Sequence, residues 1–444
     1  MGRVDTVKRL PAPGTASRWP GSLASFVSRQ AVGGVLVAYL LFVVYLATGD
    51  SKFVLLAPVL AAVPLAFGVP RAWPVFVIAA GLALPWIYGV GIGPITLSIS
   101  DVMLLGSLPG ILLCGEMRQR HDKRGRVGVV PALFALYAAV ALFVYLQFPV
   151  STSLLTIATR SVMVLVPFAC GVALANSERV LRAFLHAYVA SCAALAAVWL
   201  TSFGSPAVAG INKNPGGQML AGAILVGVVI VKKPALRTGL VLLLGGGLAA
   251  TGSRGAVVGL MAGCLVLFVL HSETRRRMSR LGQFLVSGLI AFALGYFGRT
   301  QSAFLDRSLS NETLDQRALL RADALERWHA NPIGNGVGTY VPQVAQLSQL
   351  RSNDPHNVFV LCLYEGGIPL LVAFVLLCLV PVFLVIRRSR FSWIHALAVA
   401  VPVSLLVRSY FDIYWVRATP TLCWVILGAA LATRVPSARK DQAV

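Results

Sequence analysis

The stretch RADALERWHANPIGNGVGTY, residues 321–340, lies at the centre of the longest polar interval in this chain. The interval covers residues 299–367, and long apolar runs precede and follow it. It holds many charged side chains, the two histidines His329 and His356, and a glycine-rich turn at residues 331–338. A long loop between hydrophobic elements is usually either functional or disordered. Because this one combines helix-compatible runs with turn residues, we predict that it is folded and functional.

The sequence around this interval is too apolar for a soluble protein. Of its 444 residues, 57% are hydrophobic and 12% are charged, whereas soluble domains contain about 25% charged residues. We therefore predict an all-α polytopic membrane protein with about 12–14 transmembrane helices, each needing ~20 apolar residues, and one large helical loop outside the membrane. The candidate spans are residues 30–48, 53–70, 73–91, 95–114, 128–148, 151–175, 181–203, 217–231, 237–251, 255–270, 282–298, 366–386, 392–408 and 418–433.

The distribution of basic residues predicts the orientation of these spans. The net charge is +22, and in membrane proteins Lys and Arg gather in cytoplasmic connections. If the N-terminal tail is cytoplasmic, every second connection is basic and the alternate ones carry few charges. We therefore predict cytoplasmic tails at residues 1–29 and 435–444, transmembrane helices at 30–298 and 357–434, and a periplasmic or extracellular loop at 299–356. The basic connections contain Arg71; Arg118, Arg120, Lys123, Arg124 and Arg126; Arg179 and Arg182; Lys232, Lys233 and Arg237; Arg275, Arg276, Arg277 and Arg280; Arg387, Arg388 and Arg390.

Two arginines break this pattern because they lie towards the outer face. Arg160 lies inside the span 151–175, where a charge is costly and usually faces the bundle interior or an aqueous cavity. It either serves a ligand or forms a structural ion pair, for which Asp101 is one candidate. Arg254, between Ser253 and Gly255 at the outer end of a span, has N–H groups that suit phosphate oxygens. The alternative for Arg254 is an interfacial side chain that reaches the lipid headgroups.

Other polar residues at the predicted outer face extend this set. Lys213 lies in a glycine-rich segment before the span 217–231, which is either a plain turn or a helix start whose N–H groups face an anion. Arg408 lies near aromatic residues in the last outer connection, and a functional or an interfacial role fits it equally. His356, followed by Asn357, directly precedes a helix. It is either a structural histidine or a general base, a role that suits histidine near neutral pH.

Together these residues indicate an anionic, lipid-linked ligand. Arginines could hold a diphosphate while a histidine deprotonates an acceptor hydroxyl, which is the chemistry of glycosyl transfer from a polyprenyl-diphosphate sugar. The outer loops contain no Asp-x-Asp motif and the chain contains no Walker A motif, so we expect no metal, no ATP and no other cofactor. The seven cysteines lie in or beside apolar runs without a Cys-x-x-Cys motif, which predicts packing roles.

Three stretches resemble the O-antigen ligase and polymerase superfamily of bacterial polysaccharide enzymes. Residues 317–340 are similar to the family's amphipathic loop helix and the turn that follows it. Residues 354–367 are similar to its His-Asn and downstream glycine pattern, and residues 252–255 to its Ser-Arg-Gly. The resemblance implies an inverting, metal-independent glycosyltransferase of the GT-C type, in the bacterial inner membrane, with its site on the periplasmic or extracellular face.

The resemblance also implies roles for individual residues. His356 would activate the acceptor, and Arg254 would serve catalysis by holding the undecaprenyl diphosphate of the saccharide donor. Arg160 would hold the same diphosphate, and Lys213 and Arg408 extend this donor-binding set. The loop residues expected near the acceptor are Arg317, Arg321 and Asn357.

The identity of the acceptor separates two readings of this resemblance. A ligase transfers the saccharide to lipid A–core, whereas a polymerase of O-antigen, capsule or exopolysaccharide extends another lipid-linked chain. A third hypothesis is a flippase or exporter of lipid-linked sugar, for which paired broken helices are typical. The clustering of polar residues on one face favours the enzyme. Membrane lipids are further partners, and we expect no nucleic acid because topology explains the positive charge.

Overall fold

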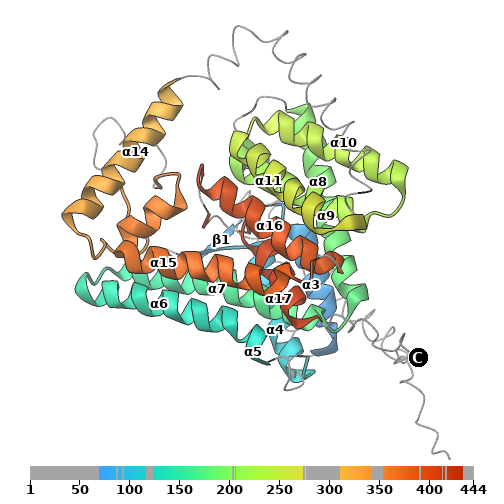
Figure 1. The fold of residues 1–444 in the computed structure, drawn as a ribbon, viewed down its shortest axis with the longest axis horizontal. Helices are drawn as coiled ribbons and strands as arrows, with labels where there is room; N and C mark the ends of the chain where they lie inside the picture. Colours follow the sequence, from blue (N-terminus) through green and yellow to red (C-terminus); the bar gives the residue numbers. More distant parts are fainter. Residues whose placement is uncertain are drawn as a thin grey trace, which may run out of the picture.

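The computed structural model is a bundle of long helices (Figure 1). It describes residues 70–86, 89–92, 95–116, 124–202, 205, 207–273, 276, 311–342, 354–389, 392–412, 414–415 and 418–433. Among these residues, five helices are long and apolar enough to cross a membrane, and shorter apolar helices pack with them. The prediction of an all-α polytopic membrane protein is confirmed. Both predicted tails and the spans 30–48, 53–70 (apart from Pro70) and 282–298 lie outside the described residues.

Helices account for most of the described chain, with short strands between some of them. Before the predicted outer loop lie η1 (Pro70–Ala72), α3 (Trp73–Ala83), α4 (Ile99–Leu113), α5 (Arg124–Val127), α6 (Val129–Gln147), α7 (Ser151–Leu174), α8 (Glu178–Thr201), α9 (Lys213–Ile230), α10 (Pro234–Thr251) and α11 (Arg254–Leu270). Within and after that loop lie α14 (Asn311–Ala330), α15 (Val358–Ile386), α16 (Trp393–Ser409) and α17 (Thr421–Ala432). The antiparallel hairpins are β1 (Gly89–Ile92) with β2 (Ile95–Ser98), and β3 (Ala207–Val208) with β4 (Ile211–Asn212).

The hairpin β1–β2 occupies a segment that was predicted as the end of one span and the start of the next. α3 ends at Ala83 rather than at residue 91, and α4 begins at Ile99 rather than at residue 95. Pro85 lacks the N–H that would continue α3. Gly89 and Gly91 in β1 have low helix propensity because glycine loses more backbone freedom than other residues. The predicted bounds of these two spans were therefore wrong at this junction.

One face of the bundle gathers the helix ends that were predicted to point outwards, and we call it the loop face. A Cβ atom at Gly217 in α9 would lie 2.8 Å from the Ser253 side chain before α11, so these two helix starts are adjacent. The start of α15 meets the end of α16 through a contact between His356 and Asp412. The other ends of these and neighbouring helices carry basic residues: Arg179 and Arg182 on α8, Lys232 and Lys233 after α9, and Arg387 and Arg388 after α15.

Close packing of α11 against α16 helps to build the loop face. Gly255, Gly259 and Gly263 recur every four residues and so lie on one side of α11. A Cβ atom at Gly259 would lie 2.6 Å from the Ser404 carbonyl oxygen and 3.3 Å from the Arg408 Cβ. Small residues at such spacing allow two membrane helices to approach closely. The approach brings the start of α11, which is Arg254, next to the end of α16.

The helix α14 lies at one end of the molecule, beside the start of α15 (Figure 1). The two helices share a small hydrophobic core that includes Leu320, Leu361 and Tyr364. Arg327 of α14 donates a hydrogen bond to the Tyr364 hydroxyl at 2.6 Å, and its guanidinium lies 4.8 Å from the centre of that ring. These contacts fix α14 to the helix that carries His356 at its start.

Candidate active site

The helix α15 is interrupted immediately after its first turns. It begins at Val358, eight residues before the predicted bound, and the backbone angles of Gly366 and Gly367 are not helical. Gly367 has φ +63° and ψ −163°, a combination that residues with a side chain rarely adopt. The Glu365 carbonyl also lacks a helical partner, because the residue four positions later is Pro369, which has no N–H. The sequence therefore divides α15 into a short first segment, residues 358–365, and a longer second one.

The glycine-rich turn at residues 331–338 supplies the hydrogen bonds that this break removes. The Asn335 N–H donates to the Tyr364 carbonyl at 2.8 Å, and the Gly336 N–H donates to the Glu365 carbonyl at 3.0 Å. The Gly338 N–H donates to the Glu365 carboxylate at 2.8 Å. Buried backbone groups need such partners, so the turn and the broken helix form one unit.

Arg160 of α7 forms a buried ion pair with Glu365. Its two terminal nitrogens contact the two carboxylate oxygens at 2.6 and 2.8 Å, and the side chains are 5% and 1% exposed. Arg160 also donates to the Tyr137 hydroxyl at 2.6 Å and lies 4.9 Å from the centre of the Trp415 ring. The suggested pairing with Asp101 was wrong, because Asp101 forms a capping box with Ser98 at the start of α4.

His356 and Asp412 form a second polar contact, on the loop face. The His356 Nδ1 lies 3.1 Å from an Asp412 carboxylate oxygen, and Arg408 donates to the other oxygen at 3.0 Å. The His356 side chain is 17% exposed, whereas those of Asp412 and Arg408 are 6% and 1% exposed. The imidazole is thus the accessible member of a chain of three groups. Arg408 Nε and Nη1 have no hydrogen-bond partner among the described residues.

Three more cations lie around this chain of groups. Lys213 at the start of α9 is close enough to Arg317, Arg254 and Asp412 to interact with their charges. Arg317 of α14 donates to the Phe411 carbonyl at 3.1 Å, directly beside Asp412. Arg254 is exposed at the first position of α11, and the Ser253 side chain does not cap this helix. Helix starts with uncapped N–H groups attract anions, so the face combines positive side chains with a favourable backbone dipole.

Residues 239–375 of the chain match a family model that is described as O-antigen ligase. This match supports the predicted resemblance to the O-antigen ligase superfamily over these residues. The matched region includes Arg254, α14, the glycine-rich turn, His356 and the break in α15. A search of curated proteins gave no match. The match supports a glycosyltransferase-type enzyme of general kind, acting in a membrane in polysaccharide biosynthesis.

Two of the predicted loop residues have local structural contacts. The Asn357 side-chain oxygen accepts the N–H groups of Phe359 and Val360 at 3.0 and 3.1 Å, which caps α15. Arg321 donates to the Arg317 carbonyl at 3.2 Å, one turn earlier in α14. Both roles near an acceptor stay predictions. The cap has a further consequence, since it sets where α15 begins and hence where His356 lies.

Two carboxylates of this candidate site were given no role from the sequence. Glu365 is the only acidic residue in the apolar stretch 358–386, and Arg160 is the only basic residue in the stretch 151–174. Because a buried charge requires a partner, these two exceptions could have been paired from the sequence. Asp412 gave a weaker signal, since it lies in a short connection with other polar and aromatic residues. Its contact with His356 depends on the packing of α15 against α16.

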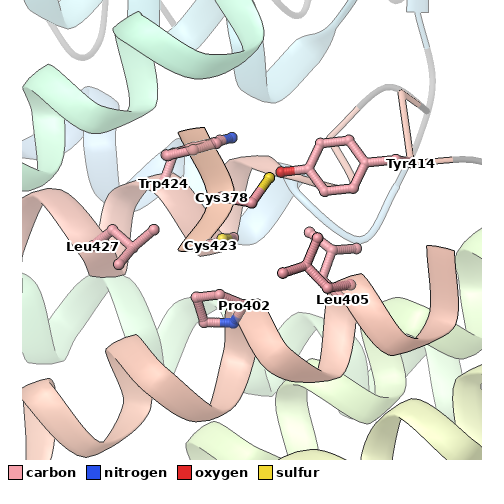
Figure 2. Close-up of a pocket in the computed structure, with 8 residues that line it drawn as sticks. Cys378, Pro402, Leu405, Tyr414, Cys423, Trp424 and Leu427 are labelled. Carbon is pink, nitrogen blue, oxygen red and sulfur yellow. The ribbon is translucent and has the colours of Figure 1, made fainter. Parts of the chain in front are cut away.

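A small apolar cavity lies between α15, α16 and α17, away from the charged groups. Its lining consists of Cys378, Pro402, Leu405, Leu406, Tyr414, Cys423, Trp424 and Leu427. Figure 2 shows the Tyr414 hydroxyl pointing towards the Cys378 sulfur. With no charged side chain in its lining, this cavity does not suit a diphosphate. The two cysteines there have the packing role that the sequence predicted, and neither forms a disulfide.

Asp354 is a buried carboxyl that supports the turn at His356. Its carboxylate accepts the His356 backbone N–H at 2.7 Å, and His356 has φ +52°. Burial raises the pKa of Asp354 from its ordinary 3.8 to about 7, against a smaller opposite effect of His356. The folded protein therefore retains a proton that the unfolded chain has lost between about pH 4 and pH 7.

Replacing Asp354 by asparagine is expected to remove part of the pH dependence of stability. In the wild type, this group favours the folded state most below about pH 4, and the contribution is lost as the pH rises to about 7. An asparagine keeps the acceptor oxygen for His356 but does not titrate. Apparent melting temperatures in detergent between pH 4 and pH 8 should fall less steeply in the variant. Equal slopes for both proteins would contradict the assignment to Asp354.

Proposed function

We propose that this protein transfers a saccharide chain from undecaprenyl diphosphate to a hydroxyl group of an acceptor glycan, without a metal ion and with inversion. The observation that carries the proposal is the 3.1 Å contact between His356 and Asp412 on a face rich in cations. We assign this face to the periplasmic or extracellular side of the bacterial inner membrane, because the opposite helix ends carry the basic residues of the positive-inside pattern. Both termini are then cytoplasmic.

In this reaction, His356 serves as the general base. If its Nδ1–H donates to Asp412, its Nε2 is an acceptor and takes the proton from the attacking hydroxyl. That oxygen forms a bond to the anomeric carbon, while the bond from this carbon to the diphosphate oxygen breaks. A single displacement inverts the configuration. Asp412 holds the imidazole in position and stabilises its protonated form, and Arg408 donates a hydrogen bond to the same carboxylate.

The leaving diphosphate requires several cationic contacts. Arg254 and Lys213 start two adjacent helices on the loop face, and both are accessible enough to reach a ligand. Arg408 contributes a buried positive charge with two hydrogen-bond donors unused by described residues. We assign these three residues to the donor, and we assign Arg317, Arg321 and the segment at Asn357 to the acceptor side because α14 borders the same face.

A reconstituted assay tests this function. The purified protein would receive undecaprenyl-diphosphate oligosaccharide in EDTA, with or without lipid A–core. Product on lipid A–core alone would establish a ligase, and longer lipid-linked glycans without this acceptor would establish a polymerase. Absence of transfer, together with movement of the sugar lipid across proteoliposomes, would overturn the enzyme in favour of a flippase.

Arg254→Ala is expected to weaken binding of the donor about 10- to 100-fold, the range for loss of a charged hydrogen bond. Arg254→Lys should restore little, because an ammonium cannot reproduce the planar fork of arginine. Donor affinity can be measured by titration of the purified variants. Arg179→Ala is a matched control, since Arg179 is also exposed at a helix start but lies at the opposite end of the bundle. Full recovery with lysine would argue against bidentate contact with the diphosphate.

A further inference from the structure

We infer that Arg160 is a positioning residue that keeps His356 and Asp412 in contact with each other, rather than a ligand of the donor diphosphate. This inference rests on the proposed function, since it concerns the geometry of the proposed base. It differs from the role that the sequence resemblance implied for Arg160. The structure supports it through the two segments that meet at the Arg160 guanidinium.

The first segment is the one that carries His356. Residues 358–365 form the short first part of α15, with His356 just before its start and Glu365 at its end. Arg160 donates hydrogen bonds from both terminal nitrogens to the Glu365 carboxylate. Because Gly366 and Gly367 interrupt α15, helical hydrogen bonds to the rest of α15 do not fix the direction of this first segment. The ion pair and the glycine-rich turn hold it instead.

The second segment is the one that carries Asp412. Trp415 follows Asp412 by three residues, and the Arg160 guanidinium lies 4.9 Å from the centre of its ring. The Trp415 ring in turn lies 6.0 Å from the ring of Tyr137, which accepts a hydrogen bond from Arg160. Arg160 of α7 therefore contacts Glu365, in the segment that follows His356, and Trp415, in the segment that follows Asp412. Figure 1 shows α6 and α7 running alongside α15.

The same contacts leave Arg160 with little capacity for a diphosphate. Both terminal nitrogens are engaged by Glu365, one of them also by Tyr137, and the side chain is 5% exposed. Only its buried Nε lacks a hydrogen-bond partner among the described residues, whereas Arg408 has two such nitrogens, one of them terminal. A donor phosphate would have to displace a carboxylate that also accepts the Gly338 N–H. Separating a buried ion pair leaves an uncompensated charge. Arg254, which is exposed at a helix start, meets the requirements of a phosphate ligand far better.

The test compares Arg160→Lys, Glu365→Gln and the double variant. If the pair positions His356, each single variant lowers kcat about 100-fold, the cost of a misplacement near 1 Å, while donor affinity changes less than twofold. The double variant should lose no more than the worse single variant, because the two residues act as a unit. Arg182→Lys is a matched control, since Arg182 pairs with Glu178 and lies over Trp393 but is located at the other end of the bundle.

Hydrogen exchange supplies a readout that does not require activity. Loss of the pair should speed amide exchange at Asn335, Gly336 and Gly338, which donate to Tyr364 and Glu365, with the rest of the bundle unchanged. If the single variants do not fold, Arg160→Met combined with Glu365→Leu removes both charges and restores an apolar contact. This double variant should keep donor affinity and lose kcat.

The outcomes separate this inference from the proposed function. If the variants exchange faster at the turn as expected but the wild type transfers no saccharide, the function is overturned while the role of Arg160 in holding the turn is retained. Weaker donor binding by tenfold or more in Arg160→Lys, without faster exchange in the turn, would make Arg160 a donor ligand and overturn the inference. Unchanged kcat and unchanged exchange in all variants would overturn it as well.

Discussion

Replacing His356 by asparagine is expected to abolish saccharide transfer while the protein folds and binds its donor. A positioned general base contributes about 10²- to 10⁴-fold to a rate, and asparagine has no group that accepts the proton. Asparagine is the better replacement because His356 has φ +52°, a conformation that asparagine tolerates and alanine does not. The rate of transfer at saturating donor is the quantity to measure.

The matched control for this prediction is His329→Asn. His329 lies exposed on α14, where its ring is 4.7 Å from that of Trp328, and it belongs to the same predicted outer loop. Its replacement should leave the rate within about twofold, since a single contact between two rings contributes about 0.5–1.5 kcal/mol and this one involves none of the groups proposed for transfer. A His356→Asn variant that retains a tenth of the wild-type rate would exclude His356 as the base.

Gly367→Ala is expected to have the largest effect on the structure of the site. A Cβ atom there would overlap the Pro332 carbonyl oxygen, and the φ of +63° with ψ of −163° itself costs about 1–3 kcal/mol for other residues. The turn must therefore move away from the break in α15. The hydrogen bonds from Asn335 and Gly336 are then lost, and His356 loses the support of its segment.

The expected result for Gly367→Ala is loss of transfer activity together with a lower apparent melting temperature. Gly245→Ala is the control, because a Cβ atom at Gly245 in α10 would meet no atom within 4 Å. That substitution should leave activity unchanged and stabilise its helix slightly, since alanine has the higher helix propensity. A Gly367→Ala protein with normal rate and stability would show that the docking of the turn on α15 is dispensable.

Local composition allowed much of this architecture to be predicted. Long apolar runs place helices in a membrane whatever their neighbours are, so most span positions agree with the described helices. The predicted span bounds were wrong where the backbone is not helical. These places are the β1–β2 hairpin after Pro85 and the break at Gly366 and Gly367 inside α15. In both places the sequence carries glycine or proline, but the partner that satisfies the irregular backbone lies elsewhere in the chain.

For the polar pairs too, the sequence indicated one residue but not its distant partner. Arg160 was recognised as an unusual charge, yet its partner Glu365 lies 205 positions away, and the residue first considered, Asp101, has a local capping role instead. His356 was recognised as a candidate base, but Asp412, 56 positions later, gave no comparable signal. Arg254, Lys213 and Arg408 were recognised as charges on the predicted outer face. The packing of α9, α11 and α16 determines that they lie near one another.

By itself, the sequence determined that this protein is a helical membrane protein whose unusual charges lie towards one face. That follows from hydrophobicity and charge, which act on each segment independently of its neighbours. Only the tertiary structure decided which charges form buried pairs and which lie exposed on the loop face. Such pairing depends on how closely helices approach, on glycines such as Gly259 that permit it, and on contacts between residues far apart in the chain. For these reasons Arg160 lies in a buried ion pair with Glu365, whereas Arg254 is exposed at a helix start.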